Sequence, residues 1–446
     1  KQRKAEIDSQ AISSKAMKNV SEKMRVCFSQ GTMMLLKRVG ALSKQLGSKA
    51  YLIGGTVRDL LLGVENLDID IVIEGDAIVF GEKLAREFHG MIISHKRFGT
   101  CSVTTPEHIK IDFATARKET YAKPAALPTV EFALLKDDLI RRDFTINAMA
   151  ISLNEDDFGF LTDFFDGVGD LEHKSIRILH DKSFIDDPTR ILRAMRFEQR
   201  LGFHIDTHAA NLILKSIEKE IYKRVEKPRL RDEIILILKE KEPFKIMKRM
   251  DEFRALKIIH PYLKFHKDLR NMFDAIDEAC LWYQDNSPRK RSIEKWIMYL
   301  MALFEDVSHD GTLYFCNIFE FKRGERLRIM SYKNNGRKIL KTLNAKRKIA
   351  PSKIYHLLEP LSHEVTLLLM AVSRSDTGKG RAMEFFHKYN GMRTVVRGDD
   401  LKALGIKIGP HLSKILEKIL YKKLDGILKT KEEELAYAKK LAKRRI

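Results

Sequence analysis

The sequence predicts an α+β fold, in which a small mixed sheet with helices occupies the first third of the chain and helices make up the rest. Two observations support this prediction. Short apolar and alternating runs are interleaved with helical runs as far as residue 153, whereas almost every patterned run from Asp181 onward has helical spacing. The length of 446 residues is enough for roughly three domains.

The elements expected in the first third follow from residue spacing and from glycines that end helices. Residues 67–75 (LDIDIVIEG) alternate as a strand does, and the other expected strands are residues 50–55, 91–98, 99–106 and 108–115. The expected helices are residues 31–47, 57–63 and 82–90. Residues 138–153 are expected to form a helix that runs into a strand, and residues 1–30 a polar linker or arm.

Composition excludes several classes of protein. No run of 18 or more apolar residues occurs, so the sequence predicts no transmembrane helix and no membrane partner. The start, KQRKAEIDSQ, lacks the apolar region of a secretory signal. The four cysteines are far apart and form no CxxC pair, which excludes a zinc ribbon and a disulfide framework. Free thiols in a reducing cytoplasm are therefore expected.

Charge is distributed unevenly along the chain. Residues 1–220 contain 32 Lys and Arg against 32 Asp and Glu, whereas the remaining residues contain 50 against 29, so the whole net charge of +21 lies in the second part. A basic excess of this size favours a polyanion such as nucleic acid as the partner. The alternative is a helical domain that is merely rich in lysine.

Two aspartates share one face of the strand expected at residues 67–75. Asp68 and Asp70 point to the same side, roughly 7 Å apart, because strand side chains alternate between faces. Like charges this close are costly without a cation between them, and Mg²⁺ binds carboxylates together with substrate phosphates. Asp112, on the strand expected at residues 108–115, is a candidate third carboxylate. The alternative is an ordinary solvated strand face.

Gly54 and Gly55 lie between an expected strand and an expected helix. Glycines allow a backbone to approach a phosphate closely, and the start of a helix offers unpaired N–H groups. Arg58, one turn into the helix, adds a charged donor. A tight turn explains two glycines equally well, but the Asp-x-Asp pair that follows so soon makes phosphate binding the favoured interpretation.

The segment RRDFTINAMA (residues 141–150) has two interpretations. Arg142, Asp143 and Asn147 together can hold a triphosphate and a ribose. Asp143 could equally be the N-cap of a helix, with the arginines in solvent.

A basic edge is expected on the helix within FIDDPTRILRAMRFEQRLGF (residues 184–203), where arginines recur every three residues at Arg190, Arg193 and Arg196. Asp187 and Arg190 form a fork that accepts and donates hydrogen bonds as a base edge does. Because Pro188 suits the first position of a helix, the alternative is that Asp187 is only an N-cap.

These segments together resemble the class II tRNA nucleotidyltransferase and bacterial poly(A) polymerase family, of the polymerase-β superfamily. The matches are LIGGTVRDLLLG with LDIDIV, RRDFTINAMA, FDGVGDLEHKSIR and DDPTRILRAMRFEQRLGF, in family order over residues 51–203. GDDLKALGIKIGPHLSKIL (residues 398–416) also resembles the tail of the long bacterial members. The chain is therefore expected to be the C-terminal catalytic part of such a protein.

The resemblance implies a polymerase-β-type nucleotidyltransferase head followed by an all-α neck, body and tail. The expected limits are an N-terminal arm and helix at 1–48, the catalytic head at 49–170, the base-recognising neck at 171–225, the RNA-binding body at 226–360 and the tRNA-binding tail at 361–446.

The resemblance also implies template-independent addition of C and/or A to tRNA 3′ ends from CTP and ATP, with Mg²⁺ as the cofactor. Asp68 and Asp70 would bind the metal, with Asp112 as a further catalytic carboxylate. The implied nucleotide-binding residues are Gly54, Gly55 and Arg58 for the triphosphate, Arg142, Asp143 and Asn147 for phosphate and sugar, Asp187 and Arg190 for the base, and Arg193 and Arg196 for phosphate or the RNA end. The base-reading motif usually begins Glu-Asp, and here it begins Asp186-Asp187, which leaves base selectivity open.

Residues 116–132 match the flexible loop of the family, and two prolines predict a mobile connector here. In members that add only C this loop is shortened. Its intact length favours addition of CCA or of the terminal A. Poly(A) synthesis is the related alternative, and an inactive RNA-binding homologue is disfavoured because a protein that only binds RNA needs no paired aspartates.

Overall fold

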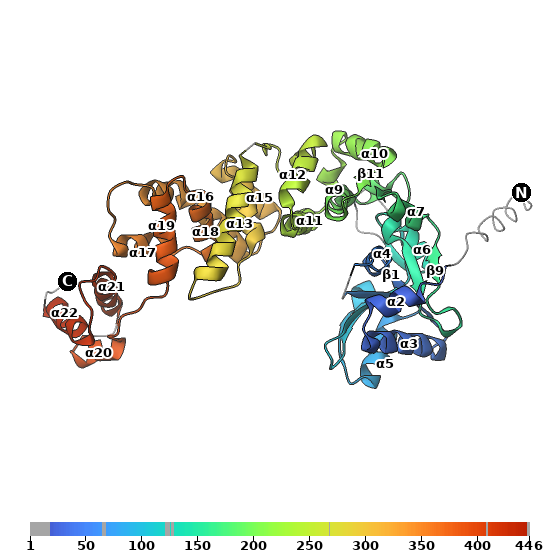
Figure 1. Ribbon diagram of the computed structural model, residues 1–446, viewed down its shortest axis with the longest axis horizontal. Coiled ribbons are helices and arrows are strands. Elements are labelled where there is room, and N and C mark those ends of the chain that lie inside the picture. Colours follow the sequence, from blue (N-terminus) through green and yellow to red (C-terminus); the bar gives the residue numbers. More distant parts are fainter. Residues whose placement is uncertain are drawn as a thin grey trace, which may run out of the picture. The chain divides into compact units, whose positions relative to one another are not determined.

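The computed structural model describes residues 18–64, 68–120, 125, 129–266, 268–406 and 409–443. The chain divides into two compact units, Lys1–Glu226 and Lys227–Ile446 (Figure 1). The first unit combines a sheet with helices, and the described part of the second unit is helical. This arrangement confirms the α+β fold class. The finer limits of arm, head, neck, body and tail stay predictions.

A seven-stranded mixed sheet forms the centre of the first unit. Its strands are β1 (Lys49–Ile53), β2 (Ile69–Glu74), β3 (Met91–His95), β4 (Thr100–Thr104), β5 (Lys110–Thr115), β8 (Met149–Ser152) and β9 (Leu161–Asp163). Their order is β3-β4-β5-β2-β1-β8-β9, and β2 and β5 are the parallel neighbours within it. The register of this parallel pair places Asp70 beside Asp112.

Helix α5 (Ala77–Glu87) packs on one face of the sheet. Its Gly81 lies so close to β4 that an added Cβ would be 2.4 Å from Cys101 Sγ. Cys101 is in register with Phe113, which is in register with Ile71, and all three side chains are buried. The odd-numbered apolar residues of β2 therefore face α5, as the alternation in the sequence predicts.

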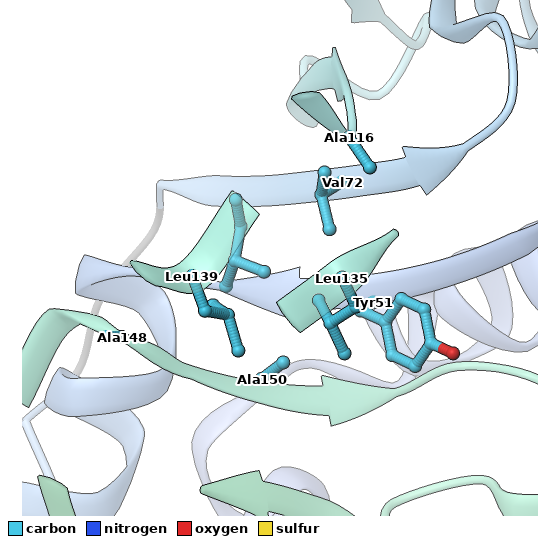
Figure 2. Close-up of a cluster of buried hydrophobic side chains, with 8 residues drawn as sticks. Tyr51, Val72, Ala116, Leu135, Leu139, Ala148 and Ala150 are labelled. Carbon is cyan, nitrogen blue, oxygen red and sulfur yellow. The ribbon is translucent and has the colours of Figure 1, made fainter. Parts of the chain in front are cut away.

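The opposite face of the sheet carries a second apolar cluster (Figure 2). Leu135 and Leu139 of α6 (Leu135–Ile140) pack there against side chains of β1, β2 and β8, among them Tyr51, Val72 and Ala150. Val72 and Asp70 share this face because they are two residues apart on one strand. Glu74 fixes the start of the helix, since its carboxylate accepts a hydrogen bond of 2.7 Å from the backbone N–H of Leu135. Helix α6 therefore ends near Asp70.

The remaining elements of the first unit surround this core. They are α2 (Ser21–Cys27), α3 (Gln30–Gln45), α4 (Gly55–Leu62), η1 (Lys96–Phe98), β6 (Arg117–Thr120), β7 (Thr129–Phe132), η2 (Thr145–Asn147), η3 (Glu155–Asp157), α7 (Gly167–Glu172), β10 (Ser175–Ile176), α8 (Ser183–Asp186), α9 (Thr189–Leu201), β11 (His204–Ile205), α10 (Thr207–Glu218) and η4 (Ile221–Arg224). Strands β10 and β11 form a short parallel pair that brackets α9.

Helices make up the second unit. They are α11 (Lys227–Lys239), α12 (Pro243–Glu252), η5 (Ala255–Ile258), α13 (Leu269–Asn286), α14 (Lys295–Leu303), α15 (His309–Ile318), α16 (Arg323–Leu343), α17 (Pro351–Leu358), α18 (His363–Ala371), α19 (Asp376–Glu384), η6 (Phe385–Tyr389), α20 (Gly398–Ala403), α21 (Pro410–Leu424) and α22 (Lys431–Lys443). Helix α14 is apolar on every side from Trp296 to Leu303 and all of these residues are buried, as expected of a central helix.

Three local predictions need correction. Residues 1–30 were expected to be an arm, but Ser21–Cys27 form helix α2 and Asn19 pairs with Phe160; residues 1–17 lie outside the described part. The ends of the expected mobile connector 116–132 are the paired strands β6 and β7, while residues 121–124 and 126–128 are not described. The polar residues of β6 and β7 suit a solvated two-stranded ribbon. The third correction concerns the arginines of α9 and is given with the site.

Within its described residues the chain has no helix long and apolar enough to cross a membrane. All four cysteines are free thiols, as predicted, and three of them are buried.

Candidate active site

Three carboxylates come together at one end of β2 and β5. Asp70 and Asp112 are in register on adjacent strands, and Asp68 is exposed just before β2 begins. Burial raises the pKa of Asp70, and the nearby charges of Asp112 and Asp68 raise it further, while Arg142 opposes them. The structure therefore brings together the carboxylates that the sequence singled out.

Asp112 already has two partners on its own face of the sheet. Ser102 Oγ donates to Asp112 Oδ1, and Lys110 Nζ lies 2.7 Å from Oδ2. Across the residues that the structure describes, no group of three or more His, Cys, Asp or Glu side chains has the spacing of a metal site. Carboxylate oxygens such as those of Asp68 and Asp70 are the ligand type that Mg²⁺ prefers, whereas one oxygen of Asp112 is already bound by Lys110.

The glycine turn is tied directly to the carboxylate strand. Thr56, in the first turn of α4, donates from Oγ1 to the backbone carbonyl of Asp68 (3.0 Å) and accepts from the backbone N–H of Asp70 (3.1 Å). Gly54 has φ +67°, a conformation that favours glycine, and an added Cβ would be 2.9 Å from Arg142 Nη1. The turn therefore needs glycine both for its backbone and for the close approach of an arginine.

Arg142 is held beside this turn by a buried carboxylate. Its Nη2 donates to Asp138 Oδ2 (3.0 Å), and Arg141 binds the other oxygen of the same carboxylate. Burial alone would raise the pKa of Asp138, but the two guanidinium groups outweigh burial and lower it. Arg142 Nε is buried and has no hydrogen-bond partner in the described part of the chain, so the guanidinium retains a donor that no protein group uses.

A chain of buried hydrogen bonds connects α4 with α9. Arg58 Nη1 donates to Asn147 Oδ1 (2.7 Å), and Asn147 Nδ2 donates to Asp143 Oδ1 (3.0 Å). Arg193 donates to Asp143 Oδ2 from Nε (2.9 Å) and Nη2 (2.6 Å). Burial would raise the pKa of Asp143, but Arg193 and Asn147 together lower it to about 2. Asp143 therefore joins these elements as a charged group and is not the N-cap that the sequence allowed.

The fork expected at the start of α9 has its own partners in the structure. Asp187 Oδ1 accepts from Thr189 N (3.1 Å) and from Thr189 Oγ1 (2.7 Å), which is the contact of a helix start. Arg190 is buried and donates to Ser183 Oγ (2.7 Å) and to the backbone carbonyl of Arg141. Base reading by these two residues stays a prediction.

The arginines of α9 do not form the exposed basic edge that their spacing suggested. Arg190 and Arg196 are only 5% and 6% exposed, and the side chain of Arg193 is 31% exposed. The three-residue spacing does keep them near one side of the helix, but that side is turned toward the carbonyl of Arg141 and the carboxylate of Asp143. Tertiary contacts therefore bury most of the arginine edge of α9, which was expected to be exposed to solvent.

Sequence reasoning missed carboxylates that position the arginines, among them Asp138 and Glu119. Asp138 precedes Arg141 and Arg142 by three and four residues, a spacing that places side chains together on a helix and could have revealed it. Glu119, on β6, binds Arg141 (2.9 Å) and Arg117 (3.0 Å), and no local pattern indicates this contact.

Comparisons with known proteins show what the chain is similar to. Residues 50–177 match the family model described as "Poly A polymerase head domain", and residues 202–266 match "Probable RNA and SrmB-binding site of polymerase A". The A-adding tRNA nucleotidyltransferase of Geobacter sulfurreducens is 38% identical over 92% of this chain and 47% of its own length. That of Aquifex aeolicus is 38% identical over 72% of this chain and 39% of its own length. The chain thus spans about half the length or less of these curated relatives.

Solved structures match the chain along almost its whole length. An apo form of a CCA-adding enzyme is 34% identical, with a TM-score of 0.78, and covers 96% of this chain and 99% of its own. A Thermotoga maritima CCA-adding enzyme complexed with tRNA is 33% identical, with a TM-score of 0.72 and the same coverage.

Proposed function

Because the chain belongs to the class II tRNA nucleotidyltransferase and poly(A) polymerase family, we propose that it is a template-independent RNA nucleotidyltransferase. It adds C and/or A, as CCA or as the terminal A alone, to tRNA 3′ ends from CTP and ATP. Addition of the terminal A is the favoured form, since the two curated relatives that match most of the chain are A-adding enzymes. A cytoplasmic location stays a prediction.

The observation that carries this proposal is the register of β2 and β5. It sets Asp70 beside Asp112 at a point where Thr56 anchors the glycine turn and Arg142 reaches Gly54. The guanidinium group of Arg142 thus lies close both to the glycine turn and to the carboxylate of Asp70. This is the arrangement that transfer of a nucleotide from a triphosphate requires, since the metal-binding and phosphate-binding groups must meet at the reacting phosphorus atom.

Asp68 and Asp70 would hold Mg²⁺, because carboxylates gathered beside Asp112 are stabilised by a divalent cation. Mg²⁺ bound there would neutralise triphosphate charge and activate the RNA 3′-hydroxyl. Asp112, whose carboxylate is paired with Lys110, would add a third carboxylate beside Asp70 and could become a further ligand.

The nucleotide would be held by the groups around the glycine turn. Gly54 and Gly55 allow the triphosphate to approach the first turn of α4, and Arg58 and Arg142 supply charged donors. Asn147 and Asp143 fix the orientation of Arg58 and Arg193, which spares these side chains an entropic cost when a nucleotide binds.

The base would be read by Asp187 and Arg190. Adenine and cytosine both present an amino donor beside a ring-nitrogen acceptor, so a carboxylate and a guanidinium suit both bases. To reach a base, Arg190 would exchange its contacts with Ser183 and Arg141 for contacts with the nucleotide.

Poly(A) synthesis is the second candidate, because the family model that matches residues 50–177 describes a poly(A) polymerase head. Incubation with tRNA transcripts ending before CCA, after C and after CC, with each NTP given separately, distinguishes the candidates. A-adding activity predicts a single A on the transcript ending in CC and no extension of the others. Long A tails would support the poly(A) alternative, and no incorporation at all would contradict both.

A further inference from the structure

Phe197 lies at the meeting point of three arginines in the first unit. Its ring is buried in α9, and the guanidinium carbons of Arg58, Arg193 and Arg196 lie 5.2, 5.5 and 4.8 Å from the ring centroid. These distances are within the range of cation–π attraction. Phe144, from the segment RRDF, packs edge-on against the same ring with the centroids 6.0 Å apart.

Bringing three guanidinium groups together around one ring costs electrostatic free energy, which other contacts must offset. Arg58 and Arg196 are 4% and 6% exposed, so their charges are largely removed from water. Asp59 balances Arg58 (2.8 Å), and Asp143 balances Arg193. The face of an aromatic ring attracts cations without adding a negative charge, so Phe197 gives the three guanidinium groups a shared contact and neutralises none of them.

The three arginines come from elements that only the fold brings together. Arg58 belongs to α4 and follows the glycine turn, and its Nη2 would lie 3.5 Å from a Cβ on Gly55. Arg193 and Arg196 belong to α9, whose first turn carries Arg190. The ring is therefore a direct link between the turn proposed to bind phosphate and the helix proposed to read the base.

We propose that Phe197 is a positioning residue for nucleotide binding, which holds Arg58, Arg193 and Arg196 at fixed distances for the triphosphate. This inference rests on the proposed function and deepens it. A triphosphate carries its charge over several oxygens, so its affinity depends on the spacing of several cations at once. Without the ring, Arg58 and Arg193 keep their hydrogen bonds to Asn147 and Asp143, but the three guanidinium groups lose the contact that they share through Phe197.

The test replaces the ring while keeping apolar volume. Phe197→Leu and Phe197→Met both lack a π face, and Met fills nearly the same space should Leu fold poorly. Phe197→Tyr keeps the ring. The matched control is Phe80→Leu, because Phe80 is also buried and packs on another aromatic ring, Phe113, with centroids 5.4 Å apart, on the α5 face of the sheet.

The measurements are the inhibition constant of inorganic tripolyphosphate, KM for ATP, kcat and the melting temperature. Phe197→Leu and Phe197→Met should raise KM and the tripolyphosphate constant about tenfold, with kcat at saturating ATP changed by less than about threefold. Phe197→Tyr should restore both constants to within about twofold of wild type. Phe80→Leu should lower the melting temperature to a similar extent and leave both constants unchanged.

Two sets of results would overturn the role of Phe197 while leaving the proposed function intact. The first is tripolyphosphate inhibition that is the same in wild type, Phe197→Leu and Phe197→Met. The second is a Phe80→Leu or Phe197→Tyr protein that loses as much affinity as Phe197→Leu. A wild-type protein that neither binds tripolyphosphate nor transfers a nucleotide would overturn the proposed function, and this inference with it.

Discussion

The buried arginines of the first unit and the exposed lysines of the second unit hold their charges in different ways. In the first unit, which is nearly neutral, buried arginines are fixed by specific partners, as Arg58 is by Asp59 and Asn147. In the second unit, which carries the basic excess, pairs such as Lys245–Glu242 and Lys402–Asp399 lie one turn apart on helix surfaces, with side chains about half exposed or more. The comparison teaches that net charge does not locate the chemistry. Desolvated, paired arginines indicate selective binding, and exposed lysines indicate long-range attraction to a polyanion.

The largest expected effect is on nucleotide transfer, and it should leave tRNA binding almost unchanged. Asp70→Asn should lower nucleotide transfer by about 10³-fold or more, because the amide keeps the size of the side chain but removes its metal-binding charge. tRNA affinity should change little, since the basic surface is elsewhere. The control is Asp76→Asn, because Asp76 is the N-cap of α5 and asparagine caps equally well. Substantial transfer by Asp70→Asn, measured in single-turnover assays, would remove Asp70 from the metal site.

The salt dependence of tRNA affinity tests whether the basic second unit binds RNA through its charge. Between 50 and 200 mM salt we expect tRNA affinity to fall on the order of a hundredfold, which corresponds to neutralisation of about four phosphates. A fragment of residues 227–446 should keep this dependence, provided that circular dichroism shows it to be helical, and residues 1–226 should show a much flatter one. If the first unit alone accounts for the dependence in filter-binding titrations, the contrast drawn between the two units is wrong.

Base selectivity tests whether a single carboxylate of the first unit, that of Asp187, contacts the base of the nucleotide. Asp187→Ala should lose about 2 kcal/mol of discrimination against UTP and GTP, roughly thirtyfold, because one hydrogen bond to the base is lost. Asp206→Ala is the control, since Asp206 caps α10 by accepting a hydrogen bond from the backbone N–H of Ala209 and lies outside the base-reading motif. Steady-state assays with each NTP give the result. Equal slowing with all four nucleotides, or only a lower melting temperature, would make Asp187 the helix cap that its contact with Thr189 suggests.

A buried pair and an exposed pair should differ in their pH dependence. The pKa of Asp143 is about 2 in the folded protein, below its ordinary value of 3.8. Its ion pair therefore stabilises the fold above about pH 4 and is lost as the pH falls toward 2, a change on the order of 2 kcal/mol. Asp143→Asn should be less stable than wild type at pH 6, and this gap should narrow at pH 3 in denaturant titrations.

The exposed counterpart is Asp399, whose side chain is 89% exposed beside Lys402. Asp399→Asn should change stability by less than about 0.5 kcal/mol at either pH, because solvent screens the pair. If Asp143→Asn behaves in the same way as Asp399→Asn, burial does not strengthen the Asp143 pair.

The smallest effect isolates one contact of the phosphate turn. Gly54 and Gly63 both have positive φ (+67° and +70°), but only a Cβ on Gly54 would meet Arg142, whereas Gly63 has open space around it. Alanine at either position should cost about 1 kcal/mol of stability. Gly54→Ala should in addition raise KM for ATP several-fold by displacing Arg142. An equal KM in the two variants would show that the close approach of Arg142 has no part in nucleotide binding.

Local sequence determined most of the elements of the first unit. Alternation located β2, and glycine located the end of α4, because these patterns depend on chain neighbours alone. The carboxylates and the arginines were found in the same way. What the sequence misjudged was their environment: Arg190 and Arg196 were expected at an edge and are buried.

The sequence by itself thus determined which residues carry charge and which elements hold them. The tertiary structure alone decided which of them meet. The parallel pairing of β2 with β5 set Asp70 beside Asp112, although 42 positions separate them in the sequence. Packing of α9 against the head joined Arg193 to Asp143 and placed Phe197 among three arginines. The physical reason is that periodicity reports only which face of an element is apolar, whereas the partner of a buried charge is chosen by contacts between elements distant in the chain.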